Sequence, residues 1–349
     1  TINFNDNVGI APRGGFGPGT FNNVGGTLAV AAGKTGSVTI ENASFSGNST
    51  FDTSAAGSAI VLAPTTSASY AGSLDVVGNG LTFAAGGATH VVADGTLLNG
   101  NMTLAGGAMQ LGSVQILGDF VHTGGSLATG AGKTVNIVAG GSLSLASGAT
   151  LGGSGAVINE GTVTFNGNTV GHAIQNSGAM VLNGTNTFSG ASFMQDGGTL
   201  TLASAGALTK SGGAFTWSGG DLQGVASGLA LTGGATASIA GGGSKVLDGV
   251  NMTVVSTDVV AGTLEVRSGT LTAGTTTIAG GATLFNNGGT VNTGALANNG
   301  TFRQAAGGTS TIGGGGTHTG TFDVAAGGTM DFAAGAQIFN GATLAGAGA

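Results

Sequence analysis

Apolar and polar residues alternate along short segments of this chain. In Thr263-Leu264-Glu265-Val266, Thr321-Phe322-Asp323-Val324 and Thr329-Met330-Asp331-Phe332, every second side chain is apolar. This period of two is that of a strand with one buried face. We therefore predict that the apolar residues of these segments point inward, namely Leu264, Val266, Phe322, Val324, Met330 and Phe332.

The strands recur at a nearly constant spacing, and a glycine opens many of them. From Gly262 onward the opening glycines are 19, 19, 20 and 21 residues apart, at Gly281, Gly300, Gly320 and Gly341. Groups such as Ala-Gly-Gly and Asn-Asn-Gly lie between the strands, where glycine and asparagine tolerate the backbone of tight corners. A repeat of about 20 residues without helical segments is typical of a solenoid of stacked β-coils.

We therefore predict an all-β fold, a right-handed parallel β-helix (β-solenoid) with about 20 residues per coil. Residues 1–20 have the least regular pattern and are expected to form an irregular lead-in or cap, and residues 21–349 a single solenoid domain. The glycine-opened strands are expected to stack in register as three parallel sheets. About 17 coils at about 4.8 Å per stacked strand would make a rod of about 80 Å.

Composition argues against several other classes. Glycine accounts for 75 of the 349 residues, but proline for only 3, and 40% of the residues are hydrophobic. Collagen and simple disorder are therefore poor fits. Glycine interrupts every stretch of helical spacing, so we expect almost no α-helix. No run of 18 apolar residues occurs, and no transmembrane segment is expected.

The charge balance argues against nucleic acid as a partner. The net charge is −7, and nucleic-acid binding requires a basic stripe that neutralises phosphates. The absence of cysteine is compatible with a secreted protein and with the cytosol. Because Thr1 is not a methionine and no signal-peptide pattern follows it, we expect a processed or excised piece. The basic residues are scattered singly, at Arg13, Lys34, Lys133, Lys210, Lys245, Arg267 and Arg303.

No cofactor-binding or metal site is predicted. Gly33-Lys34-Thr35 and Gly132-Lys133-Thr134 end like a phosphate-binding loop, but leucine stands where the first glycine of that motif is required. We interpret Lys34 and Lys133 as solvated corner residues. The histidines are far apart in the sequence, without the spacing of metal ligands. They are His90, His122, His172 and His318.

No catalytic residue is predicted either. Asp323 and Asp331 fall on outward positions of consecutive strands, and such a pair could act as acid and base in a carbohydrate-active β-helix. Both follow the same apolar-Asp-apolar pattern, so we interpret them as copies of one solvent-facing position. Only 21 charged residues (7 basic plus 14 acidic) serve the whole surface, and no long insertion walls a cleft. We do not expect an enzyme.

Threonine pairs raise the question of an ice-binding face. Thr275-Thr276-Thr277, Thr199-x-Thr201 and Thr162-x-Thr164 would give outward threonine ladders if their coils align. The outward positions vary among threonine, serine, aspartate, glutamate and asparagine, which does not favour one flat face. We interpret the outward threonines as good strand formers.

Several phrases resemble the repeats of very large bacterial surface proteins. These are the filamentous-haemagglutinin-like and autotransporter-like adhesins, whose exported parts are right-handed parallel β-helices. The resemblance covers most of residues 125–349, and an Asn-Pro-Asn secretion motif is not found near Thr1. It rests on Phe215-Thr216-Trp217-Ser218-Gly219-Gly220-Asp221-Leu222, Lys245-Val246-Leu247-Asp248-Gly249, Asn298-Asn299-Gly300-Thr301-Phe302-Arg303 and the run from Gly316 to Gly328.

The resemblance implies a structural or adhesive shaft segment of a bacterial surface adhesin or matrix protein, located extracellularly or on the outer cell surface. A self-assembling filament subunit joined head to tail is an alternative, and a carbohydrate-active β-helix enzyme is one of a different class. The final strand pattern, Asn340 to Leu344, would leave an end coil with unpaired backbone groups. We expect the chain itself or adjacent repeats as partners there, and surfaces or glycans elsewhere.

Overall fold

The computed structural model describes residues 2–4, 9–10, 21–31, 34, 36–41, 43–85, 87–204 and 206–348. Within them the chain forms short strands and no helix, so no helix is available to cross a membrane. The chain divides into two compact units, unit 1 (Thr1–Ala173) and unit 2 (Ile174–Ala349). Apart from residues 2–4 and 9–10, the predicted lead-in at residues 1–20 lies outside the described residues.

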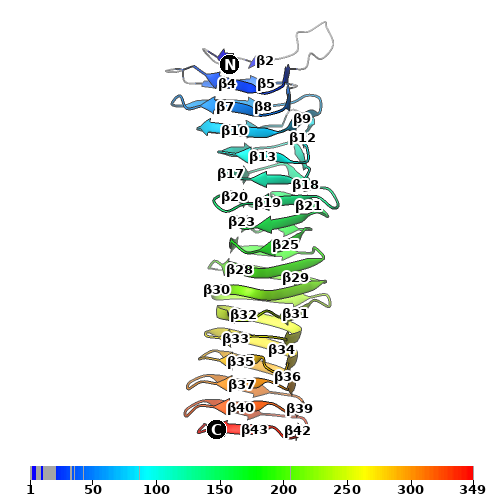
Figure 1. Ribbon diagram of the computed structural model, residues 1–349, viewed down its shortest axis with the longest axis vertical. Helices are drawn as coiled ribbons and strands as arrows, with labels where there is room; N and C mark the ends of the chain where they lie inside the picture. The colour runs from blue at the N-terminus through cyan, green and yellow to red at the C-terminus, as the bar shows by residue number, and fades with distance from the viewer. Residues whose placement is uncertain are drawn as a thin grey trace. The chain divides into compact units, whose positions relative to one another are not determined.

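Unit 1 is a β-solenoid with three parallel sheets, in which each strand pairs with the third strand after it (Figure 1). Sheet 1a contains β1 (Ile2–Phe4), β4 (Gly26–Val30), β7 (Ser49–Thr53), β10 (Ser73–Gly78), β13 (Thr96–Asn99), β16 (Val114–Ile116), β19 (Thr134–Ile137) and β22 (Ala156–Asn159). Sheet 1b contains β2 (Gly9–Ile10), β5 (Gly36–Ile40), β8 (Ser58–Leu62), β11 (Leu81–Phe83), β14 (Met102–Leu104), β17 (Asp119–His122), β20 (Ser142–Leu145) and β23 (Thr162–Asn166). Sheet 1c contains β3 (Phe21–Asn23), β6 (Ala43–Ser46), β9 (Ala68–Ala71), β12 (Thr89–Val92), β15 (Ala108–Leu111), β18 (Ser126–Thr129), β21 (Thr150–Gly153) and β24 (Thr169–Val170).

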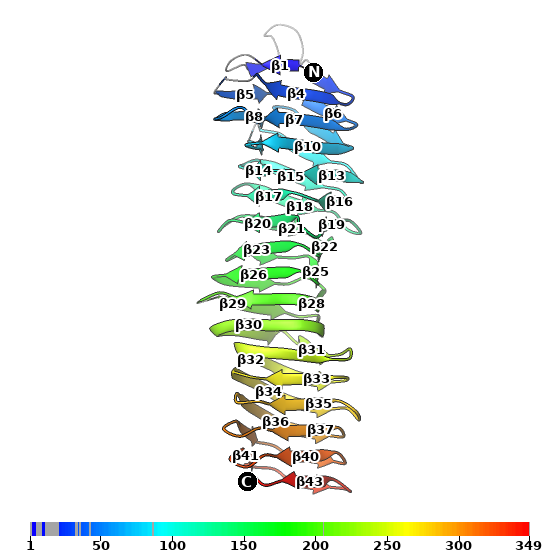
Figure 2. The same cartoon turned by 60° about the vertical axis from the view of Figure 1, so that its left-hand side comes forward.

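Unit 2 also has three parallel sheets, but several of its strands continue around a corner from one sheet into the next (Figure 2). These long strands are β28 (Ser192–Leu202), β30 (Ala214–Thr232), β32 (Ser244–Val259), β34 (Gly269–Ile278) and β36 (Thr290–Asn298). Sheet 2a consists of parts of all five together with β25 (Ala173–Asn176), β31 (Thr236–Ile239), β39 (Gly316–His318) and β42 (Gln337–Phe339).

The other two sheets of unit 2 share the long strands. Sheet 2b consists of parts of β28, β30 and β32 with β26 (Ala179–Asn183), β33 (Thr263–Val266), β35 (Thr283–Asn286), β37 (Thr301–Gln304), β40 (Thr321–Val324) and β43 (Thr343–Gly346). Sheet 2c consists of parts of β30, β32, β34 and β36 with β27 (Thr185–Phe188), β29 (Ala207–Ser211), β38 (Thr309–Ile312) and β41 (Thr329–Phe332).

The predicted fold is confirmed. The described strands form a parallel β-solenoid whose turns are about 20 residues apart, and every described pairing in the two units is parallel. The glycine-opened strands stack in register, as the partnership of Thr263 with Thr283 and of Thr283 with Thr301 shows. Because each coil returns to the same place after about 20 residues, equivalent outward residues form columns along a sheet.

The core is a set of apolar rows from the inward positions of the three sheets. Leu264 and Val266 are fully buried, and Phe322 and Met330 are buried, as predicted. Val324 and Phe332 are only half-buried, which differs from the prediction. Val324 stacks on Gly346, which has no side chain to cover it, and Phe332 lies in the last described strand of sheet 2c.

Two inward lysines stabilise the corners of unit 2. Lys245 is fully buried, and its ammonium group donates to the carbonyl oxygens of Gly241 at 2.5 Å, Gly242 at 3.3 Å and Gly243 at 3.5 Å. Lys210 is likewise buried and donates to the carbonyl oxygen of Gly190 at 2.8 Å and to that of Gly212. Burial lowers the pKa of both ammonium groups. These ammonium groups donate to carbonyl oxygens of the glycine corners, one of which, that of Gly243, also accepts from the backbone N–H of Thr263 at 2.9 Å.

We call the Lys245 ammonium group and the three carbonyl oxygens around it the lysine cage. The residue just before the next strand, Gly262, cannot carry a side chain. Gly262 has a φ of +68°, and a Cβ atom there would lie 2.4 Å from the carbonyl oxygen of Gly243 and 2.8 Å from Nζ of Lys245. The opening glycine of this coil therefore serves two purposes, because it adopts a left-handed backbone and leaves room for the lysine cage.

Candidate binding face

The outer surface of sheet 2b brings hydroxyl, carboxylate, guanidinium and aromatic side chains together. Strands β33, β35, β37 and β40 each place one threonine and, two residues later, a second outward side chain. The register aligns the threonines into a threonine column of Thr263, Thr283, Thr301, Thr321 and Thr343. The second column contains Glu265, Phe285, Arg303 and Asp323.

A shallow groove lies between these two columns. Its volume is about 460 Å³, and its walls are Ser244, Thr263, Glu265, Thr283, Phe285, Thr301, Arg303 and Asp323. The hydroxyl groups of the threonine column line one side, and charged and aromatic side chains line the other. The backbone of the sheet is hydrogen-bonded within the ladder, so only side chains are available to a ligand on this surface.

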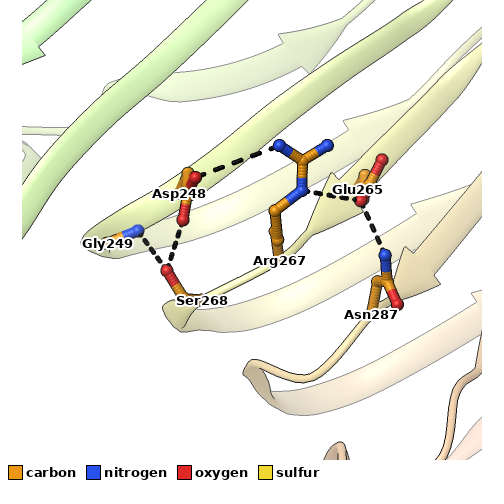
Figure 3. Close-up of polar contacts among 6 residues, drawn as sticks. All are labelled: Asp248, Gly249, Glu265, Arg267, Ser268 and Asn287. Atoms are coloured by element: carbon orange, nitrogen blue, oxygen red, sulfur yellow. Dashed lines mark hydrogen bonds and ion pairs between the residues drawn. The ribbon is translucent and has the colours of Figure 1, made fainter.

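Glu265 is the centre of a hydrogen-bonded cluster at one end of the groove (Figure 3). Its Oε1 accepts from Nε of Arg267 at 3.1 Å and from Nδ2 of Asn287 at 2.8 Å. Nη1 of Arg267 also lies 4.0 Å from Oδ2 of Asp248. The hydrogen bond from Arg267 to Glu265 is the main cause that raises the pKa of the guanidinium group. Arg267 therefore keeps its positive charge between two carboxylates.

Ser268 fixes the carboxylate of Asp248 in this cluster. The hydroxyl of Ser268 donates to Oδ1 of Asp248 at 2.5 Å and accepts from the backbone N–H of Gly249 at 2.7 Å (Figure 3). These contacts join two successive coils, because β32 supplies Asp248 and the segment after β33 supplies Ser268. The cluster is thus held in place by neighbouring backbone.

Phe285, Arg303 and Asp323 form the other end of the groove. The guanidinium carbon of Arg303 lies 4.9 Å from the ring centroid of Phe285, which is a cation–π distance. Nε of Arg303 lies 3.5 Å from Oδ2 of Asp323. The Arg303 side chain remains 58% exposed, whereas Glu265 is only 14% exposed. Arg303 is therefore far more accessible to a ligand than the committed carboxylate of Glu265.

Together these residues form what we call the charged strip. It presents three carboxylates and two guanidinium groups around a single aromatic ring. Among the residues whose side chains the structure describes, Phe285 is the only phenylalanine, tyrosine or tryptophan at an outward strand position. The strip consists of Asp248, Glu265, Arg267, Phe285, Asn287, Arg303 and Asp323.

Asp323 and Asp331 are not copies of one position, which corrects the interpretation from the sequence. Asp323 lies on β40 in sheet 2b, and Asp331 lies on β41 in sheet 2c. Both point outward, as their strand pattern predicts, but they belong to different faces of the coil. The similarity of the two segments reflects the common alternation of inward and outward residues, because any strand of the solenoid follows it.

The four histidines are all buried rather than grouped at a surface. His90 accepts a hydrogen bond from the Tyr70 hydroxyl at Nδ1, 2.8 Å away, and its Nε2 lies 3.1 Å from the carbonyl oxygen of Ala84. Nε2 of His318 lies 2.9 Å from Oε1 of Gln337. Within the described part of the chain, no three histidine, aspartate or glutamate side chains lie close enough to hold a metal ion.

Burial determines the protonation of the histidines in unit 1. It lowers the pKa of His90, His122 and His172. The Ala84 carbonyl can only accept, so Nε2 of His90 donates to it, and in the neutral ring Nδ1 is then the atom that accepts from Tyr70. Burial also raises the pKa of the Tyr70 hydroxyl well above its usual range.

Thr199 and Thr275, two of the threonines singled out in the sequence, do not belong to outward threonine ladders. Thr199 pairs with Ala179 and Asp221, Thr275 pairs with Ser256 and Ala295, and Thr276 is buried. Instead, threonines align elsewhere, in the column on sheet 2b and in a second column on sheet 2c. The second column contains Thr270, Thr290, Thr309 and Thr329.

The lysines of the two glycine-lysine-threonine segments are accessible. Lys34 is exposed, while the other residues of its segment lie outside the described residues. Nζ of Lys133 lies 2.6 Å from Oδ2 of Asp94, and the two side chains are 41% and 57% exposed. This agrees with their interpretation as solvated corner residues.

The sequence period of about 20 residues also contains a signal for the charged strip. Residues two places after each opening threonine, from Glu265 to Asp323, recur with the same period of about 20 residues as the glycines. Aligning the chain by that period brings Glu265, Phe285, Arg303 and Asp323 into one column. The buried positions of Lys210 and Lys245 had no comparable signal.

No family model, no curated protein and no solved structure matches this chain. The resemblance to bacterial surface adhesins is therefore supported at the level of the fold, a β-solenoid of stacked parallel coils.

Proposed function

We propose that this chain is a structural and adhesive element, a shaft segment of a bacterial surface adhesin or extracellular matrix protein. The observation that carries this proposal is the unbroken series of parallel ladders in each unit, for example from β33 through β35 and β37 to β40. Each coil buries its apolar side chains against the coils before and after it, so neighbouring coils stabilise one another along the stack.

The outer faces favour repeated contact over a single deep site. Outward positions recur from coil to coil, and the groove on sheet 2b is lined by side chains from five strands, β32, β33, β35, β37 and β40. Many weak contacts along a repeated face give a strong overall attachment, because each contact after the first is intramolecular. Surfaces and glycans are the partners that such a face would bind.

An adhesion assay tests this proposal. Beads coated with the purified chain are expected to attach to bacterial and host-cell surfaces under flow, and attachment should rise steeply with coating density because it is multivalent. Electron micrographs of the same material should show separate rods or fibres. Globular particles together with no attachment above albumin-coated beads would rule out a structural and adhesive role.

A further inference from the structure

We propose that the charged strip and the adjoining threonine column of sheet 2b bind an extended neutral polysaccharide that lies along the stack of coils. This inference rests on the proposed adhesive function and names its ligand class. It is carried by the juxtaposition of an outward, half-buried aromatic ring, accessible charged hydrogen-bonding groups and a row of hydroxyls in one groove.

The aromatic ring is the first argument for a sugar ligand. Phe285 is half-buried at a position where the neighbouring coils place Glu265 and Arg303. An apolar ring on a water-exposed strand face contributes little to the core. The flat ring suits the C–H face of a pyranose ring. The guanidinium carbon of Arg303 lies over the ring, 4.9 Å from its centroid.

The hydrogen-bonding groups give the second argument. Threonine hydroxyls both donate and accept, and recur about every 4.8 Å along the sheet because one is placed on each coil. An extended chain of pyranose rings advances by a similar distance per ring. Arg303 and Asp323 add a donor and an acceptor on the opposite wall, at 58% and 42% exposure. Sugar hydroxyl groups, which are also donors and acceptors, match this lining.

The charges of the strip and the paired backbone of the sheet argue against polyanions and protein strands as ligands. The strip carries three carboxylates, Asp248, Glu265 and Asp323, against two guanidinium groups that already pair with them. A polyanion such as a nucleic acid or a uronic-acid polymer would meet net repulsion there. A protein strand cannot pair with the outer face of a sheet, because its backbone groups are already used within the ladder.

The test is affinity electrophoresis of the full chain in gels that contain a soluble polysaccharide. The probes are a β-1,3-glucan, a mixed-linkage β-1,3-1,4-glucan and, as the anionic comparison, polygalacturonate. We expect retardation by at least one neutral glucan and none by polygalacturonate. Retardation by polygalacturonate alone, or by none of the three, would overturn the proposal.

Variants locate the binding. Phe285→Ala is expected to weaken glucan binding at least tenfold. Thr283→Val removes one hydroxyl without changing the side-chain volume and is expected to weaken glucan binding several-fold. Thr311→Val on sheet 2c is the matched control, since its outward side chain lies on another face. Circular dichroism melting curves confirm that each variant is folded. Equal weakening by Thr311→Val, or unchanged binding by Phe285→Ala, would contradict the proposed site.

Three further outcomes distinguish failure of the polysaccharide site from failure of the adhesive function. If beads coated with Phe285→Ala attach to cells as strongly as the parent chain, while the parent binds no glucan, adhesion stands and the polysaccharide groove is wrong. Release of reducing ends from the glucan by the parent chain would show an enzyme and overturn the binding role. Glucan binding that persists while the parent beads fail to attach would support the groove and reject adhesion.

Discussion

At the scale of single residues, inward and outward positions differ sharply in what they tolerate. Phe322 is 2% exposed. The centroid of its ring lies 5.0 Å from the ring centroid of His318 and 5.6 Å from that of Phe332. The next residue, Asp323, points to solvent and has only the exposed ion pair with Arg303. The two neighbours therefore make a matched pair for testing the orientation of the strand.

Replacing Phe322 with Asp is expected to lower the free energy of unfolding by several kcal/mol, because a carboxylate without a partner would lie in an apolar row. Asp323→Ala should change it by no more than about 0.5 kcal/mol, since surface ion pairs contribute little. Thermal melting of both variants measures the difference. A similar loss in both would show that the inward and outward assignment is wrong.

Buried histidines make the stability of unit 1 depend on pH. The pKa values of His90, His122 and His172 are lowered in the folded state. As the pH falls below about 6.5, the usual histidine pKa, the unfolded chain takes up protons before the folded chain does. The stability is therefore complete above that pH and decreases on acidification toward the lowered pKa values.

We expect the melting temperature of the chain to be lower at pH 5 than at pH 7.5. Circular dichroism at a series of pH values measures it. In His122→Leu the decrease should be smaller, because leucine cannot be protonated and matches Leu104 and Leu145 in the same inward row. A melting temperature that rises on acidification, or an unchanged slope in His122→Leu, would contradict this account.

At the scale of the secondary-structure elements, the corners need as much explanation as the strands. Strands of a parallel solenoid satisfy their backbone groups in the ladders, but the turns between them do not. In unit 2 inward side chains donate to backbone carbonyl oxygens near the corners. Besides the lysines, Nε1 of Trp217 donates to the carbonyl oxygen of Gly220 at 2.9 Å, and Nδ2 of Asn298 to that of Thr321 at 2.9 Å.

The lysine cage predicts that Lys245→Met lowers the free energy of unfolding by about 2 kcal/mol, although methionine fills a similar volume. The loss arises because the carbonyl groups of Gly241, Gly242 and Gly243 lose a charged donor. Lys133→Met is the control, because its pair with Asp94 is exposed and should contribute less than about 1 kcal/mol. Urea titration of both variants measures the contributions, and equal values would exclude the cage.

At the scale of the whole molecule, stability is expected to be local. Each coil contacts mainly the coils before and after it, so a damaged coil should not unfold distant ones. The two units provide the test. Phe120 is buried in sheet 1b of unit 1, and Phe322 is buried in sheet 2b of unit 2.

In Phe120→Asp, hydrogen exchange is expected to accelerate in unit 1 and to remain unchanged in unit 2, and in Phe322→Asp the reverse should hold. Mass spectrometry of exchanged peptides provides the measurement. Faster exchange throughout both units in either variant would show that the chain unfolds as one cooperative body and would rule out local stability.

The sequence by itself determined the solenoid, the spacing of its coils and the direction in which most strand residues point. It could do so because a period of two within strands and a period of about 20 between them are local properties of the chain. The polar and charged composition of the outer faces could be read in the same way.

Only the tertiary structure decided which sheet each strand joins and which side chains come into contact across neighbouring coils. Which sheets Asp323 and Asp331 belong to depends on where the corners place β40 and β41, which enter sheets 2b and 2c. The burial of Lys210 and Lys245 depends on carbonyl groups of glycine corners that only the folded coil brings within reach. A lysine in a glycine-rich chain is otherwise expected at the surface, since an ammonium group without such partners is too costly to bury.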